Sequence, residues 1–391
     1  MVTREWNPEI RTHLDTKISL GKEVRILKFP THEVHYLPFK PGILDRAYLN
    51  FGENFLRPFF LLVKLLDVFL VRFTLRFTSF RNFVPYLETL VKEQQPEKLI
   101  VSGEPFYLFR LGYYLKKKFN LSWLADYRDD WSTNQLQLEK SGGAVRRWIA
   151  RVESNYEKRW VSTAKKIISV SEIYTKRVSN FLKRPGITIQ NGFEEELLKG
   201  SFYELNPNFT LIYSGVIYPS QDIRMILEVL EISLKNGYPF RLVFLGAAFD
   251  IKEKKRIESL IPSQVKSFVE LTDRYPRQEA LEILRKGHAF LGIAYGSMKG
   301  IPSSKLYEYL ALGKPVLLCP TDNDIMEQML KESGMGFFCK SAAEGAEKIR
   351  EIMQLYKHPE YIAEMKIKAK DAVMPYSRFN QLKLLAQELG N

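Results

Sequence analysis

Short apolar runs, many of them rich in β-branched residues, alternate along most of this chain with longer segments whose apolar residues recur at helical spacing. Such alternation is typical of α/β layers, in which helices cover a sheet of parallel strands. It occurs in two series, with candidate strands at residues 98–102, 123–127, 166–170 and 187–189, and then at residues 209–214, 240–245, 288–293 and 315–319. The pattern predicts two doubly wound domains of similar size, with ligands beyond the carboxyl ends of the strands.

A polar stretch at residues 200–208 separates the two series and predicts an interdomain linker. The length of 391 residues is also that of two domains. We therefore assign residues 1–200 to an N-terminal domain and residues 201–375 to a C-terminal domain. A final helical segment, residues 376–391, follows a Met-Pro step and is expected to turn back to the N-terminal domain.

Cysteine and histidine are sparse. Cys319 and Cys339 are the only cysteines, and both lie in apolar stretches, which fits a reducing compartment. The five histidines are scattered and show no paired metal-ligand spacing. We expect neither a disulfide framework nor a metal ion or other cofactor at the active site.

The charge of the chain is concentrated in its first half. The whole sequence has 58 Lys and Arg residues against 45 Asp and Glu, a net charge of +13. Residues 1–200 contain 33 against 22, a balance of +11, which leaves 25 against 23, or +2, for the rest. This asymmetry suggests an anionic neighbour for the first half. Nucleic acid is not expected, because there is no aromatic RNA-binding strand, Cys/His finger or basic leucine-zipper pattern.

Residues 55–77, FLRPFFLLVKLLDVFLVRFTLRF, raise the question of membrane contact. Charged residues interrupt the segment too often for a bilayer-spanning helix. As one helix it would place Arg57, Lys64, Arg72 and Arg76 within about 120° of arc, beside a wide apolar face. Two interpretations remain open: a helix packed on the domain core with its basic stripe in water, or an amphipathic helix in direct contact with an anionic membrane surface.

The segment GIPSSKLYEYLALGKPVLLC, residues 300–319, contains a candidate anion site. Ser303 or Ser304 is placed to cap a helix, whose N-terminus offers N–H groups and partial positive charge to a diphosphate. Lys305 adds a full charge in the first turn. Glu308, one turn further on, has the carboxylate that could accept hydrogen bonds from a ribose diol. An ordinary helix with a serine cap and a glycine stop would have the same pattern.

Within this segment, SKLYEYLALGKPVL resembles the donor-site signature of glycosyltransferases with the GT-B fold, specifically the GT4-type family. Further segments match in the same order: ADYRDDW (125–131), IISVSE (167–172), ITIQNGF (187–193), LIYSGVIYPSQD (211–222) and LVFLGA (242–247). The resemblance covers the chain from about residue 98 to its end. It implies two Rossmann-like domains facing a cleft, and transfer of a sugar from a nucleotide-diphosphate donor without a metal ion and with retention of anomeric configuration.

The resemblance also implies roles for particular residues of the C-terminal domain. Glu308 matches the glutamate that binds the donor ribose. Ser303, Ser304 and Lys305 match the loop and helix start that face the diphosphate. Gly215 matches the glycine that lets the backbone of the first loop approach the phosphates.

This chain departs from the family pattern at several of its charged positions. A second glutamate, eight residues before the ribose-binding one, is replaced by Gly300. An arginine and a lysine of the first loop, which neutralise the leaving diphosphate in many members, are replaced by Val216 and Asp222. Lys305 is therefore predicted to be the catalytic cation, since charge that accumulates on a leaving group needs a fixed positive partner.

On the acceptor side, the His-Asp pair of many relatives reads Arg128-Asp129 here, followed by Asp130. Arginine does not deprotonate in this pH range and cannot be a base. Asp129 or Asp130 is a candidate to orient or deprotonate an acceptor hydroxyl, and a structural Arg–Asp pair is the alternative. The loop that carries Gly103 and Glu104 is expected to border the cleft and contact the acceptor.

Members of the family begin with an apolar strand, a glycine-containing loop and a helix, whereas this chain begins with what resembles the end of the second strand. The first strand and helix of the N-terminal domain are therefore expected to be missing, either because the start is placed too late or because the transferase is degenerate. The resemblance implies a lipid-linked or other saccharide acceptor and a role in surface polysaccharide synthesis, with the protein cytoplasmic and peripheral on the inner face of the membrane. A nucleotide-sugar 2-epimerase of the same fold and an inactive sugar-nucleotide-binding protein are the alternatives.

Overall fold

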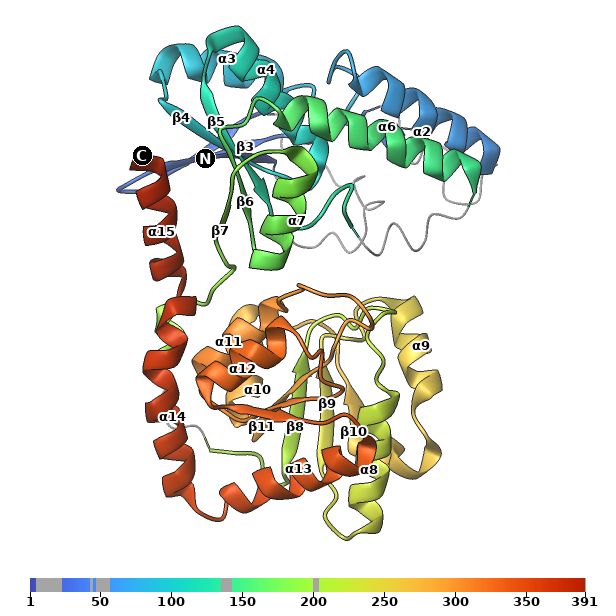
Figure 1. Ribbon diagram of the computed structural model, residues 1–391. Coiled ribbons are helices and arrows are strands. Elements are labelled where there is room, and N and C mark those ends of the chain that lie inside the picture. The colour runs from blue at the N-terminus through green and yellow to red at the C-terminus, as the bar shows by residue number, and fades with distance from the viewer. Residues whose placement is uncertain (5–22, 43–44, 47–56, 135–142, 200–203, 391) are drawn as a thin grey trace. The chain divides into compact units, whose positions relative to one another are not determined.

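The computed structural model describes residues 1–4, 23–42, 45–46, 57–134, 143–199 and 204–390 (Figure 1). The chain divides into two compact units. The first unit consists of residues Met1–Ser169 and Thr175–Ile187, and the second of residues Val170–Tyr174 and Thr188–Asn391. By this division the second unit begins before the polar stretch at residues 200–208. Each unit is described by itself.

The first unit is built on a parallel sheet whose described strands have the order β4-β5-β6-β7. These are β4 (Lys98–Ser102), β5 (Ser122–Tyr127), β6 (Lys166–Ser169) and β7 (Gly186–Thr188). A smaller sheet contains β1 (Val2–Arg4), β3 (Glu33–Leu37) and β2 (Arg25–Lys28), with β1 parallel and β2 antiparallel to β3. The helices of the unit are α2 (Arg57–Val71), α3 (Phe83–Gln94), α4 (Phe109–Phe119), α6 (Ala144–Val161) and α7 (Glu172–Leu182), with a 3-10 turn, η2 (Phe106–Leu108).

Aromatic side chains fill the core of the first unit. Trp123 and Tyr127 of β5 are fully buried, and Trp131 stacks on Trp160 of α6 with ring centroids 6.0 Å apart. A Cβ atom at Gly112 of α4 would lie 2.5 Å from the Trp123 ring. The absence of a side chain at this position therefore lets α4 pack directly on the indole.

The most deeply buried carboxylate among the described residues of this unit is that of Glu157. Glu157 of α6 is 0% exposed, and its carboxylate accepts hydrogen bonds from the Tyr127 hydroxyl at 3.0 Å and the Ser132 backbone N–H at 3.1 Å. Burial raises the pKa of Glu157 to about 7, although both hydrogen bonds oppose the shift. In the sequence, Glu157 is an acidic residue within a basic helical segment. Nothing in that pattern predicts that its side chain is buried.

The expectation of one helix over residues 55–77 is wrong. Residues 55 and 56 lie outside the described residues, and α2 ends at Val71. The Val71 carbonyl, which a longer helix would use for its own hydrogen bonding, accepts instead from Arg110 Nε of α4 at 2.5 Å. Arg72 and Arg76 therefore lie in turns beyond the helix, and the predicted stripe of four basic residues along one helix does not form.

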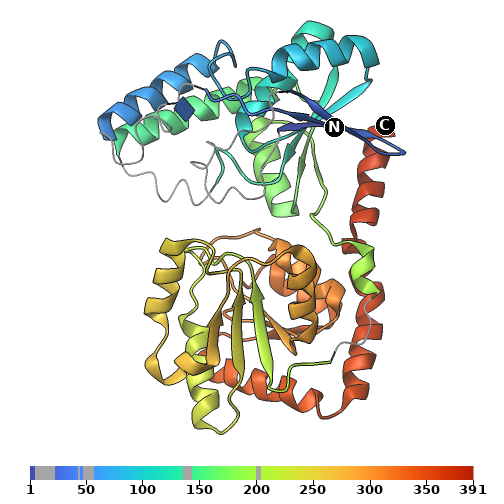
Figure 2. The ribbon, with the colours of Figure 1, turned by 180° about the vertical axis from the view of Figure 1, so that it is seen from behind.

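The second unit contains a parallel sheet whose described strands have the order β10-β9-β8-β11-β12-β13 (Figure 2). The strands are β8 (Thr210–Ser214), β9 (Arg241–Leu245), β10 (Val269–Leu271), β11 (Ala289–Gly292), β12 (Val316–Leu318) and β13 (Gly336–Phe338). The helices between them are α8 (Arg224–Lys235), α9 (Ile251–Leu260), α10 (Arg277–Lys286), α11 (Ser304–Leu312), α12 (Ile325–Ser333) and α13 (Ala342–Leu355). The prediction of parallel α/β layers in both halves of the chain is confirmed.

Helices cover both faces of this second sheet, because its strands are apolar on both sides. Ala289 and Leu291 of β11 face the core shared with α8, α9 and α13. Phe290 lies between them in sequence and points to the other face, where its ring stacks on Tyr309 of α11 at 4.4 Å. The strand order reverses between β8 and β11, and in such sheets the carboxyl ends of the strands beside this point are the usual ligand site.

The C-terminal segment is broken into α14 (Pro359–Val373), a 3-10 turn η5 (Met374–Tyr376) and α15 (Arg378–Gly390). It is tied within the second unit to the segment before η3 (Glu195–Leu198). Phe193 N donates to Tyr376 O at 3.1 Å, and Gln381 accepts from Gln190 N at 2.7 Å. The return of this helix to the N-terminal domain stays a prediction.

Candidate functional site

Glycines and cations gather at the carboxyl ends of β8, β9 and β10. Gly215 follows β8 with φ +103° and Gly246 follows β9 with φ +83°, both in a region that favours glycine. A Cβ atom at Gly246 would lie 3.9 Å from Gly215 Cα and 3.8 Å from Cγ of Arg274, which follows β10. Three strand ends thus present bare backbone and an arginine at one edge of the sheet.

Lys305, in the first turn of α11, lies over Gly215. A Cβ atom at Gly215 would be 2.5 Å from Lys305 Cε and 3.2 Å from its Nζ. Nζ is 6.0 Å from the Tyr213 ring centroid and 5.8 Å from that of Tyr218. Burial lowers the pKa of Lys305, the nearby Arg274 acts in the same direction, and Glu308 opposes it. An anionic ligand at this edge would relieve the cost of holding a half-buried ammonium group there.

The first turn of α11 is held rigidly against the sheet. Ser303 is its N-cap, with extended backbone angles of φ −62° and ψ 126°, and Ser304 is the first helical residue. Among the described residues, no side chain caps this turn with a hydrogen bond. Ser214 N, at the end of β8, donates to the Tyr309 hydroxyl of α11 at 2.7 Å. The first N–H groups of α11 are therefore fixed beside the loop after β8, as anion binding at a helix N-terminus requires.

Glu308 is positioned by an arginine that the sequence analysis missed. Its Oε1 accepts a 2.6 Å hydrogen bond from Nη1 of Arg277, the first residue of α10. Nη2 of Arg277 also lies 3.9 Å from a carboxylate oxygen of Glu194. No sequence signal links Arg277 to Glu308, because the two residues are 31 positions apart on different helices.

The loop after β8 is fixed from inside by Gln221, which is 1% exposed. Its Oε1 accepts from the Tyr213 hydroxyl and from Tyr218 N, each at 3.1 Å, while its Nε2 donates to Ile293 O at 3.1 Å. The neighbouring Asp222 carboxylate is paired with the Arg224 guanidinium at 2.6 Å. Asp222 therefore does not leave an isolated negative charge in the loop after β8.

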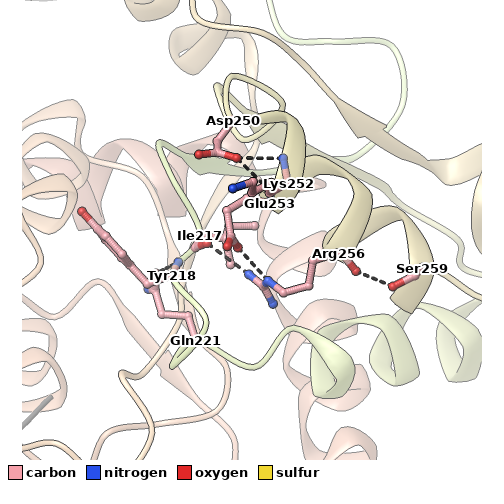
Figure 3. A network of polar contacts seen from close by, with 8 residues as sticks. All are labelled: Ile217, Tyr218, Gln221, Asp250, Lys252, Glu253, Arg256 and Ser259. Carbon is pink, nitrogen blue, oxygen red and sulfur yellow. Dashed lines mark hydrogen bonds and ion pairs between the residues drawn. The ribbon is translucent and has the colours of Figure 1, made fainter. Parts of the chain in front are cut away.

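Helix α9 holds the same loop from outside (Figure 3). Arg256 donates to Ile217 O at 3.1 Å, and Glu253 fixes Arg256 with a 2.6 Å contact to its Nε. Asp250 caps the helix by accepting from the N–H groups of Lys252 and Glu253. The backbone of the loop is thus held by an arginine of α9 rather than by a cation of its own.

A side chain would be sterically hindered at Gly300, the position of the expected second glutamate. Its φ is +81°, and a Cβ atom there would lie 2.7 Å from Ile173 Cγ2. Its carbonyl accepts from Ser171 Oγ at 2.8 Å, and its N–H donates to the Asp324 carboxylate. A side chain at this position would require both the backbone and Ile173 to move.

In the first unit, Gly103 and Glu104 follow β4. Gly103 N donates to Asp126 O of β5 at 2.8 Å, and a Cβ atom at Gly103 would lie 2.7 Å from the Phe106 ring. Burial raises the pKa of Glu104, and the adjacent Asp129 carboxylate, to which it is hydrogen-bonded, raises it further. The structure therefore brings Glu104 and Asp129 together at the ends of neighbouring strands.

The other two candidates on this side are ion-paired. Arg128 Nε donates to Asp126 Oδ2 at 3.0 Å. Asp130 is 3% exposed and accepts from Arg177 Nη1 of α7 at 2.8 Å, and burial raises its pKa against the effect of Arg177. Asp129 is the exposed member of the acidic pair in ADYRDDW, whereas Asp130 is part of a buried ion pair.

Two further searches concern metals and membranes. Over the residues that the structure describes, no group of three or more His, Cys, Asp or Glu side chains is arranged to hold a metal ion. Within the same residues, no helix is both long and apolar enough to cross a bilayer.

A comparison with protein families finds a match in the second unit, the part of the chain that contains Gly215, Lys305 and Glu308. Residues 199–369 match the family described as Glycosyl transferases group 1. No curated protein matches the chain in sequence.

Solved structures similar to this chain extend the comparison to both units. Sucrose-phosphate synthase from Thermosynechococcus elongatus has a TM-score of 0.62 and 15% identity, over 100% of this chain and 88% of that one. A UDP-forming trehalose-phosphate synthase from Burkholderia xenovorans has a TM-score of 0.64 and 10% identity, over 94% and 90%. HepE from Anabaena, solved with UDP-glucose, has a TM-score of 0.55 and 11% identity, over 78% and 82%.

At these identities the solved structures establish the fold, and the family match establishes the kind of enzyme. The chain has the GT-B fold of two Rossmann-like domains. It is a glycosyltransferase, and its residues 199–369 are similar to the group 1 family.

Proposed function

We propose that the second unit binds a nucleotide-diphosphate sugar at the edge formed by Gly215, Lys305 and Glu308. The observation that carries the proposal is the half-buried Lys305 ammonium group, which lies over Gly215 in the first turn of α11. A diphosphate at this edge would meet the N–H groups of that turn and the ammonium group together. The Glu308 carboxylate, one turn along, would accept hydrogen bonds from the ribose. The complex of HepE with UDP-glucose supports a donor of this class.

In the proposed reaction, the bond between the sugar C1 and the diphosphate oxygen breaks, and its electron pair stays on the diphosphate. Lys305 and Arg274 stabilise this charge as it develops, which is the role of the two missing loop cations. These two cations support a reaction without a metal ion. The acceptor oxygen forms the new bond to C1 and loses its proton, and we propose retention of configuration as in the GT4-type enzymes.

On the acceptor side, we propose that the Glu104 and Asp129 carboxylates of the first unit contact the hydroxyl that receives the sugar. Their position side by side at the ends of neighbouring strands supports this role, because a carboxylate within reach of the hydroxyl can accept its proton. Gly103 gives the acceptor access to the backbone beside them. Asp130 and Arg128 would hold the loop in place through their ion pairs.

We further propose that the acceptor is a lipid-linked saccharide, elongated on the cytoplasmic face of a membrane for surface polysaccharide. The balance of +11 in residues 1–200 supports an anionic surface as the neighbour of the acceptor side.

Calorimetry with UDP, GDP and ADP on the full chain tests the donor site. Glu308→Ala removes a charge-assisted acceptor that contributes about 1.5–3 kcal/mol, so affinity for the nucleotide that binds should fall by about tenfold or more. A matched control is Glu270→Ala, because Glu270 forms an equally short 2.6 Å pair with Arg241, on β10 and β9. The control should bind nucleotide as the wild type does. Unchanged binding by Glu308→Ala would refute the donor site.

Transfer is tested separately by incubating the full chain with the nucleotide sugar of the base that binds and an undecaprenyl diphosphate-linked sugar as acceptor. We expect a product one sugar larger and release of the nucleoside diphosphate. Nucleotide binding with transfer only to water or to soluble sugars would reject the lipid-linked acceptor and leave the donor site intact.

A further inference from the structure

The solvent-facing side of α2 is apolar rather than polar. Leu62, Leu66 and Phe69 are 65%, 46% and 54% exposed, and at 100° per residue they fall within about 60° of arc. Phe73, just beyond the helix, is 61% exposed, and its ring centroid lies 5.4 Å from that of Phe69. These four residues, here called the apolar strip, form one continuous row.

The opposite side of α2 packs against the rest of the first unit. Val63, Val68 and Val71 are buried, and Val68 O accepts a 3.0 Å hydrogen bond from the Tyr156 hydroxyl of α6. Both ribbon views show α2 and α6 side by side (Figures 1 and 2). The apolar strip is therefore not needed to bury α2 in its own domain, and exposed apolar rows of this kind mark interaction surfaces.

Basic residues flank the apolar strip. Arg72 and Arg76 are exposed where it ends, and the Arg72 guanidinium lies 5.7 Å from the Phe73 ring centroid. On the adjacent α6, Arg147 and Arg151 are exposed, and Trp148 between them is 48% exposed. A helix face of Leu and Phe beside arginines and a tryptophan has the composition of interfacial helices, which lie in the plane of an anionic bilayer surface.

We propose that the apolar strip is a membrane-docking surface, inserted at the boundary of headgroups and acyl chains while the flanking arginines contact anionic headgroups. The positive charge of the arginines favours an anionic lipid surface as the partner. A second copy of this domain is disfavoured, because the two basic domains would repel each other. The biological role of the surface rests on the proposed function, whose lipid-linked acceptor lies in the membrane. Insertion of apolar side chains, rather than attraction of a basic stripe, is the main contribution.

The test is co-sedimentation of the full chain with vesicles of phosphatidylcholine alone and of phosphatidylcholine mixed equally with phosphatidylglycerol. The variant Leu66→Gln/Phe69→Gln/Phe73→Gln removes most of the apolar strip and keeps good helix formers within α2. Binding to the anionic vesicles should fall by about tenfold or more. At low salt, the variant Arg72→Gln/Arg76→Gln should bind the anionic vesicles more weakly than the wild type. Near 1 M salt the two should bind alike, because the screening length is then about 3 Å and ionic attraction is largely lost.

The matched control is Ile367→Gln/Phe379→Gln/Leu382→Gln in the second unit, where the three side chains are 72%, 56% and 59% exposed. This control should sediment as the wild type does. Equal sedimentation of the strip variant and the wild type, or equal loss in the control, would overturn the proposal. A wild-type dimer that the strip variant dissociates, without vesicle binding, would overturn it in favour of a second copy.

Folding and the donor site are checked on the same proteins. The strip variant should keep the thermal transition and the nucleotide affinity of the wild type. If the triple variant does not fold, Phe73→Gln alone, beyond the end of α2, should reduce vesicle binding in the same direction. Because no nucleotide is present during sedimentation, absence of nucleotide binding by the wild type would refute the proposed function without affecting the vesicle result.

Discussion

Gly215→Ala should damage the donor site through Lys305 rather than through the backbone alone. The new Cβ atom would lie 2.5 Å from Lys305 Cε and 3.2 Å from Nζ, so the lysine side chain must leave its place over the loop. The backbone at φ +103° adds strain of about 1–3 kcal/mol. Loss of the ammonium group from the diphosphate removes a charge-assisted hydrogen bond of about 1.5–3 kcal/mol, which is a roughly 10- to 150-fold loss of nucleotide affinity.

Gly237→Ala separates these two effects. Gly237 also has a positive φ, +79°, but a Cβ atom there would meet nothing within 4 Å. Both variants should therefore unfold at a lower temperature, by about 2–4 °C for each kcal/mol in a domain of this size. Only Gly215→Ala should lose nucleotide affinity.

The assay is calorimetry with the nucleotide that the wild type binds, together with thermal unfolding of each variant. In a double-mutant cycle, Gly215→Ala should add little to the loss of affinity in Lys305→Ala, because both changes remove the same contact. Wild-type affinity in Gly215→Ala would refute the reasoning. Fully additive losses in the double variant would show that the two residues act independently.

Lys305→Ala should lower turnover more than nucleotide affinity, as single-turnover kinetics and calorimetry can show, because charge on the leaving group is greatest in the transition state. Arg274→Gln should lower turnover in the same way and raise the lowered pKa of Lys305, so that activity is lost at higher pH than in the wild type, which a pH–rate profile measures. Because of Glu157, the protein should become less stable as the pH rises from about 4.5 to about 7, since the folded state keeps a proton that the unfolded state has lost. The pKa shift corresponds to a loss of roughly 3 kcal/mol at most in the free energy of unfolding. Glu157→Gln should flatten this part of the stability profile in thermal unfolding, and an unchanged slope would assign the dependence to other groups.

The sequence alone was sufficient to predict the α/β layers and the helix that begins at Ser304, because both depend on local patterns. Buried parallel strands require continuous apolar runs. The candidate anion site at this helix start places Ser303, Ser304, Lys305 and Glu308 within two turns. The second unit could therefore be interpreted in functional terms before its contacts were known.

Only the tertiary structure decided which distant residues surround the candidate sites. Arg277 fixes Glu308 from another helix, and Arg274, after another strand, is near enough to lower the pKa of Lys305. Asp130 forms an ion pair with Arg177, 47 residues away. No local pattern encodes such pairs, because each depends on how separate elements pack.

The same limit explains the error at residues 55–77. Periodicity showed that this segment has both an apolar face and basic residues, but the periodicity of one helix does not say which face the rest of the domain covers. The structure buries Val63, Val68 and Val71 and leaves Leu62, Leu66 and Phe69 in solvent. Arg110, from a helix about 40 residues further on, satisfies the Val71 carbonyl where the sequence predicted continuous helix. The composition of a helix is local, whereas its orientation and its end are set by the elements that pack against it.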